Sequence, residues 1–116
     1  MKIQIRGHNT AITDGIRQHV EERFTARIGK QVSDLAVLSV DLLEEHRQQV
    51  AEATLQLKGV TLRAREESGD LMHSVDLVAD KLARQVKRHR DKRRGRGRRD
   101  GAGLKGASPE PPPEPA

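Results

Sequence analysis

The sequence contains no cysteine and almost no aromatic side chains. Phe24 is the only Phe, Tyr or Trp among the 116 residues. Without cysteine the chain has no disulfide, no thiolate nucleophile and no zinc site built on sulfur. A single such ring also excludes a series of aromatic platforms on which nucleic-acid bases could stack. Any hydrophobic core must therefore be built from Ile, Leu, Val and Ala.

A long apolar run is missing as well. Residues 2–6 already alternate polar and apolar side chains, so the start of the chain lacks the continuous apolar stretch of a signal peptide or a membrane span. We therefore expect a cytoplasmic protein.

Signatures of catalysis and of metal binding are weak. The five histidines are scattered without an H-x-x-x-H spacing, and no Ser or Thr lies in a recognisable nucleophile motif. The glycines after residue 94 follow a predicted helix, which is the wrong context for a phosphate-binding loop. We expect no enzyme, no catalytic residue, no metal site, no cofactor and no small-molecule substrate.

Positive charge is concentrated at one end of the chain. Residues 1 to 80 carry 10 Lys and Arg against 13 Asp and Glu, a net charge of −3, whereas residues 81 to 116 carry 12 against 4, a net charge of +8. Such asymmetry favours a polyanionic partner, with RNA, DNA and an anionic membrane all open at this point.

Hydrophobic periodicity predicts six elements and one domain. A period of two residues predicts strands, and a period near 3.6 predicts helices. Thr13 is the expected N-cap of the first helix and Gly29 its stop, while Lys58 and Gly59 are expected to form a tight turn. The expected elements are a strand over 2–6, a helix over 14–28, strands over 35–42, 51–57 and 60–65, and a helix from about 69 to 94, with a polar connection over 44–49.

This order predicts an α+β fold of the type β-α-β-β-β-α. Both helices can cover one face of a four-stranded sheet, which gives a domain over residues 1–94. Residues 95–116 form a basic Gly/Arg segment followed by a Pro-rich end, and this composition predicts a disordered tail.

The last predicted helix has a basic side. Its apolar residues fall on one face, and most of its Lys and Arg residues fall on the opposite side at a spacing that can follow phosphates. We therefore expect RNA binding, with a general RNA-binding module or RNA chaperone and an amphipathic helix on anionic membrane as alternatives. The expected RNA-binding residues are Lys81, Arg84, Lys87, Arg88, Arg90 and Lys92.

Several short motifs resemble the short bacterial ribosome hibernation-promoting factors, also called ribosome-associated translation inhibitors. The motifs are Ile-x-Gly-x-Asn at 5–9, Ile-Thr-Asp-Gly-Ile-Arg at 12–17, Ala-Thr-Leu at 53–55, Gly-Asp-Leu-Met at 69–72, Val-Asp at 75–76 and Lys-Leu-Ala-Arg-Gln-Val-Lys at 81–87. Their order and spacing cover about residues 1 to 92. Met72 and His73 depart from the family, which commonly has tyrosine after the Asp-Met pair.

The resemblance implies a domain that lodges between the head and body of the 30S subunit, alone or within the 70S ribosome. It implies contact with 16S rRNA, competition with mRNA and tRNA, and a reversible stop of translation in stationary phase or stress. No membrane partner is implied. The family's basic helix positions match Lys81, Arg84, Lys87, Arg88 and Arg90, and its acidic pair matches Asp70, a candidate helix cap, and Asp76.

Overall fold

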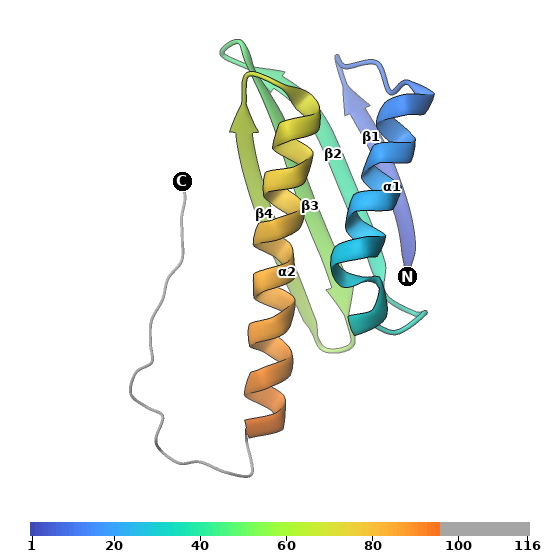
Figure 1. Cartoon of the computed structure of the whole chain (residues 1–116), viewed down its shortest axis with the longest axis vertical. Coiled ribbons are helices and arrows are strands. Elements are labelled where there is room, and N and C mark those ends of the chain that lie inside the picture. The colour runs from blue at the N-terminus through green and yellow to red at the C-terminus, as the bar shows by residue number, and fades with distance from the viewer. Residues whose placement is uncertain (96–116) are drawn as a thin grey trace.

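The computed structural model describes residues 1–95, with side chains as far as Lys92, and has the predicted order of elements (Figure 1). The elements are β1 (Lys2–His8), α1 (Asp14–Ile28), the short 3-10 helix η1 (Gly29–Gln31), β2 (Val37–Glu45), β3 (Gln48–Leu57), β4 (Val60–Ser68) and α2 (Leu71–Gly95). The α+β class is therefore confirmed. The predicted disorder of the tail concerns residues that lie outside the described part, apart from Gly95 at the end of α2.

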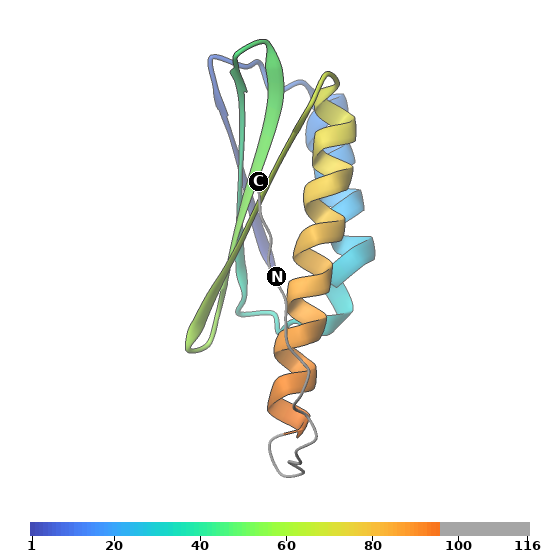
Figure 2. The same cartoon turned by 90° about the vertical axis from the view of Figure 1, so that its left-hand side faces the viewer.

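The four strands form one sheet in the order β1-β2-β3-β4. β1 pairs in parallel with β2, and the other two neighbouring pairs are antiparallel. Figure 2 shows α1 and α2 side by side on the same face of this sheet. The prediction of two helices covering one face of a four-stranded sheet is confirmed.

The core lies between the sheet and the two helices. Phe24 and Leu82, from α1 and α2, are both fully buried, and burial of a side chain of this size is worth about 1.5–3 kcal/mol. The strands contribute alternate residues to the same core, as the period of two requires. Because the apolar side of each helix packs in this core, its polar side remains available for other contacts.

Both helices begin at the residues that the sequence indicated. Thr13 Oγ1 accepts a hydrogen bond of 3.1 Å from the backbone N–H of Ile16. Asp70 Oδ2 accepts one of 3.0 Å from the backbone N–H of His73. Each side chain satisfies a donor that the helix itself cannot, which fixes where α1 and α2 start.

The connection between β2 and β3 is much shorter than predicted. The strands continue to Glu45 and from Gln48, and those two residues pair with each other. Only His46 and Arg47 remain in the turn, with φ angles of 51° and 65°. These left-handed angles match a two-residue hairpin turn, and the usual Asn-Gly signal for such a turn is absent. The prediction of a polar connection over 44–49 is therefore wrong.

The start of β2 also differs from the prediction. β2 begins at Val37, and Leu35 is 89% exposed in the turn that precedes it. Ser33 holds that turn, because its Oγ accepts from the N–H of Leu35 at 3.1 Å and its carbonyl accepts from the N–H of Ala36 at 3.1 Å. By contrast, the tight turn predicted at Lys58 and Gly59 is confirmed, with Gly59 at a φ of 83°.

Candidate nucleic-acid interface

The C-terminal half of α2 carries five cations among the residues whose side chains the structure describes. Arg84, Lys87, Arg88 and Lys92 are exposed, and Arg90 is half-buried. Of the six residues expected to bind RNA, only Lys81 and Lys87 form ion pairs with carboxylates of the described residues. The others keep their charge available to a partner.

Lys81 does not lie where the sequence placed it. Its Nζ is 3.1 Å from Glu66 Oε2 and 3.4 Å from the carbonyl oxygen of Arg65, both on β4. The side chain is 20% exposed. The prediction that Lys81 lies opposite the packed side of the helix is therefore wrong, because its long side chain reaches the carboxylate and carbonyl groups of β4.

Lys81 and Gln85 together cover the outer edge of β4. Gln85 Nε2 donates a hydrogen bond of 2.6 Å to the carbonyl of Arg63, two residues before the carbonyl that receives Lys81. The backbone of an edge strand otherwise presents unpaired polar groups to other chains. We define these two contacts as the β4 edge seal.

The remaining cations of α2 lie on more than one side of the helix. Arg88 and Lys92 follow Lys81 at i+7 and i+11, so they share its side, away from α1. Lys87 and Arg90 instead line a groove shared with α1. The prediction of one cationic strip is corrected to two basic flanks.

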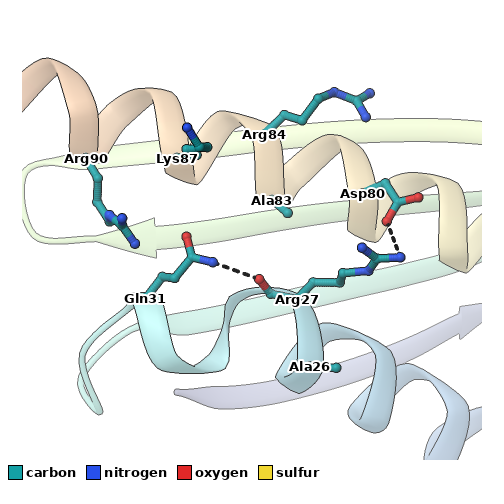
Figure 3. A pocket seen from close by; sticks show the side chains of 8 residues that line it. All are labelled: Ala26, Arg27, Gln31, Asp80, Ala83, Arg84, Lys87 and Arg90. Carbon is teal, nitrogen blue, oxygen red and sulfur yellow. Dashed lines mark hydrogen bonds and ion pairs between the residues drawn. The ribbon is translucent and has the colours of Figure 1, made fainter.

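The groove between α1 and α2 has a volume of about 620 Å³ (Figure 3). Arg27 crosses it, with its Nη2 3.0 Å from Asp80 Oδ1 on α2. Gln31 donates from Nε2 to the carbonyl oxygen of Arg27 at 3.1 Å. The groove is lined by Ala26, Arg27, Gln31, Asp80, Ala83, Arg84, Lys87 and Arg90.

Sequence reasoning missed the contribution of α1 to this groove. Arg23, Arg27 and Gln31 recur at i+4 spacing, which is the available signal, but the spacing alone does not say that this side faces α2. The charges that line the groove are four cations and one carboxylate. It is therefore a positively charged groove.

Ahead of the groove, by contrast, a carboxylate of α2 is paired with side chains of α1. Asp76 Oδ1 of α2 lies 2.8 Å from His19 Nε2 and 2.9 Å from Arg23 Nε, both on α1. The ion pair between Arg27 and Asp80 follows one turn later. Beyond Asp80 the groove side of α2 changes from acidic to basic residues, so the positive field is concentrated toward the C-terminal end of the helix.

Two of the cations on the outer face of the sheet are paired with carboxylates, whereas Lys2 and Arg63 on the same face form no ion pair within the described residues. Arg6 Nε lies 3.0 Å from Asp41 Oδ1, and Arg65 contacts both Glu45 and Glu52. The hydrogen bond that Arg65 donates to Glu45 is the largest cause that raises the pKa of Arg65, and the bond to Glu52 also raises it, whereas burial lowers it. The larger group of cations without an ion pair lies on α2, where Arg84, Arg88, Arg90 and Lys92 follow one another within nine residues.

Within residues 1–95, no group of three or more His, Asp or Glu side chains is arranged to hold a metal ion. In the same part of the chain, no helix combines the length and the apolar character needed to cross a membrane.

Comparisons of the sequence with a family model and with known proteins indicate the same family. Residues 3–94 match the family model described as Sigma 54 modulation protein / S30EA ribosomal protein. The chain is 35% identical over 92 residues to the ribosome hibernation promoting factor of Azotobacter vinelandii, covering 79% of this chain and 85% of the relative. It is 35% identical to the factor of the same name from Salmonella typhimurium, covering 79% and 96%.

A solved structure agrees with these sequence matches. The crystal structure of the Thermus thermophilus Protein Y N-terminal domain matches with a TM-score of 0.68 at 33% identity, covering 77% of this chain and 99% of that chain. The family resemblance seen in the sequence motifs is confirmed.

Proposed function

The chain belongs to the Sigma 54 modulation protein / S30EA ribosomal protein family, and we propose that it is a ribosome hibernation factor of the cytoplasm that binds the small ribosomal subunit. Bound there, alone or in the 70S ribosome, it reversibly inhibits translation in stationary phase or stress. The relatives' name, ribosome hibernation promoting factor, supports this function. The observation that carries the proposal is the concentration of uncompensated cations on the C-terminal half of α2.

The proposed mechanism is steric occlusion of the mRNA and tRNA channel. α2 is anchored by fully buried residues such as Leu82, so its cations stand on a rigid support within the domain 1–94. When Lys and Arg neutralise phosphates of 16S rRNA, condensed counterions are released, and this release supplies the binding free energy. No bond is made or broken, so the protein acts without catalysis.

The proposed rRNA contacts are those cations of α2 that face solvent or the groove. They are Arg84, Lys87, Arg88, Arg90 and Lys92. Lys81 is assigned a structural role instead, because its ammonium group is held against β4.

The membrane alternative loses its main support. An amphipathic helix binds a lipid surface through its apolar face, and that face of α2 is occupied by the core, with Val78 and Leu82 fully buried. A general RNA-binding module remains the rival function.

Binding to purified 30S subunits tests the proposal. Arg84→Glu should weaken binding strongly, whereas Arg47→Glu makes the same charge change at the β2–β3 turn, at the other end of the molecule (Figure 1), and should have little effect. Competition separates the rival: mRNA and tRNA should displace a hibernation factor from 30S, whereas unrelated duplex RNA should titrate a general binder equally well. Equal binding by both variants would reject α2 as the contact surface.

A further inference from the structure

We propose that the open edge of β1 is a docking site for an extended segment of a partner protein, in which apolar residues alternate with acidic ones. The segment adds to the four-stranded sheet as a further strand beside β1. This site is independent of the proposed function, because none of the cations of α2 takes part in it. Its basis is the free backbone of β1, the half-buried isoleucines on its core side and the basic residues on its outer side.

β1 has a row of backbone groups that no other strand of the described structure pairs with. β1 is the end strand of the sheet, and only β2 lies beside it (Figure 1). The N–H of Lys2 donates to the carbonyl oxygen of Ala36 at 2.8 Å, so the backbone groups of Lys2 face the β2 side. Because these groups alternate in direction along a strand, those of Ile3 and Ile5 point away from β2. They form a short template to which another strand can pair.

The two edges of the sheet differ in how their backbone is covered. The β4 edge seal occupies carbonyl oxygens of β4 with the side chains of Lys81 and Gln85. On β1, the one backbone group that receives a side-chain hydrogen bond from the described residues is the carbonyl of His8, 3.3 Å from Thr10 Oγ1. That bond lies at the end of the strand, so the first half of β1 stays open to pairing.

The core side of β1 has apolar surface that a further strand would cover. Ile3 and Ile5 are half-buried and pack against the core from the edge of the sheet. Ile12 lies beside them, because its Cδ1 would be 3.0 Å from a Cβ at Gly7, and it occupies this face at that end of β1. An added strand places every second side chain on the core side, so apolar residues at those positions would bury the exposed parts of Ile3 and Ile5.

The outer side of β1 favours acidic partners. Lys2, Arg6 and His8 are exposed, and the strand itself carries no carboxylate. Asp41 Oδ1 lies 3.0 Å from Arg6 Nε and 3.2 Å from His8 Nε2, so one carboxylate serves both side chains. Lys2 forms no ion pair within the described residues. Opposite charges on neighbouring strands attract, so the outward side chains of the added segment should be Glu or Asp.

The same charges disfavour a second copy of this chain as the occupant. Two β1 strands side by side would bring the Lys2, Arg6 and His8 side chains of one copy close to those of the other. Like charges on neighbouring strands destabilise the pairing. The β4 edge of a second copy is covered by its own edge seal. The charges therefore favour a segment of a different protein.

A peptide titration of the full chain tests the site. The probe is the capped hexapeptide Glu-Val-Glu-Val-Glu-Val, followed by amide NMR shifts and hydrogen exchange. We expect it to shift the amides of Ile3 and Ile5 and to slow their exchange, with a Kd at or below about 1 mM. The capped peptide Lys-Val-Lys-Val-Lys-Val should bind about tenfold more weakly. Unchanged amides of Ile3 and Ile5 at about 5 mM acidic peptide would overturn the proposal.

A charge reversal in the chain tests the outer side of β1. Lys2→Glu should weaken binding of the acidic peptide about fivefold. Lys58→Glu is the matched control, because it makes the same change at the exposed β3–β4 turn, and it should stay within about twofold of the native chain. Thermal unfolding checks that both variants keep the fold, and Lys2→Gln replaces Lys2→Glu if the latter does not. Equal weakening by the two reversals would indicate general charge attraction and reject the site.

N-methylated peptides test the backbone pairing. Methylation of the three valines removes one row of peptide N–H groups, and methylation of the three glutamates removes the other row. Only one row faces β1 in a paired strand, so one methylated peptide should lose binding and the other should keep it. Equal effects of the two methylations would contradict strand addition. If the amides of Ile3 and Ile5 are already protected without peptide, and more so at higher protein concentration, the occupant is a second copy and the proposal is wrong.

Discussion

Lys81 Nζ lies 3.1 Å from Glu66 Oε2, so the first cation of the basic run in α2 is part of the fold rather than of the open surface. We predict that Lys81→Ala lowers the free energy of unfolding by about 1 kcal/mol, through loss of a partly shielded ion pair and of the packed side-chain stem. Affinity for 30S should change by less than about twofold, since the ion pair with Glu66 already compensates the charge of Lys81. Chemical denaturation and 30S co-sedimentation measure the two effects.

Arg84 is the matched comparison on the same helix. Arg84→Ala should leave the unfolding free energy within about 0.5 kcal/mol and weaken 30S binding. A Lys81→Ala variant with native stability and poor 30S binding would return Lys81 to the RNA-contacting set.

The salt dependence of 30S affinity should report the number of phosphate contacts. With about five cations of α2 engaged, the log-log slope of 30S affinity against salt concentration should be on the order of −4, from about 0.7 to 0.9 per contact. Arg88→Gln should make this slope shallower by roughly one. Filter binding over a salt series gives the slope, and a nearly salt-independent affinity would contradict counterion release.

Gly7 is required by a close approach of the chain to itself. A Cβ at Gly7 would lie 2.1 Å from the backbone oxygen of Thr10, whereas a Cβ at Gly69 would meet nothing within 4 Å. Gly7→Ala should therefore destabilise the domain by about 2 kcal/mol, the usual scale of a steric insertion. Gly69→Ala should be neutral or stabilise by less than about 1 kcal/mol. Thermal unfolding of the pair checks this, and equal melting temperatures would be inconsistent with the contact.

The β2–β3 turn offers a stabilising substitution. Arg47 has a φ of 65°, a left-handed angle that costs a residue with a side chain about 1 kcal/mol relative to glycine. Arg47→Gly should raise the unfolding free energy by about 0.5–1 kcal/mol. Arg47→Ala controls for loss of the charge and should give no such gain; if both raise stability equally, electrostatics rather than backbone strain is the cause.

Local signals in the sequence were sufficient for most of the fold. Thr13 and Asp70 cap the helices because capping depends on side chains a few residues apart, which the sequence displays directly. The turn at His46 and Arg47 was missed because Arg47 is not of a type that favours left-handed angles and the pair is not the usual Asn-Gly or Asp-Gly signal. The pairing of β2 with β3, rather than the turn residues themselves, determines where the turn lies.

The site was only partly predictable, because it depends on how the helices meet. Helical periodicity separated the apolar side of α2 from its charged sides, but it could not show that β4 would receive Lys81. It also could not show that Arg27 of α1 would cross to Asp80. Both contacts join residues far apart in the chain, so no local pattern encodes them.

The β4 edge seal bears on how this protein behaves when many copies accumulate. Copies of a sheet can join into a filament only if both edge strands of each copy are free to pair with a strand of another copy. Lys81 and Gln85 occupy two carbonyl oxygens at one of those edges, so a strand that added there would have to displace both side chains. The helix that carries the exposed cations thereby also disfavours strand-to-strand association at this edge of the sheet.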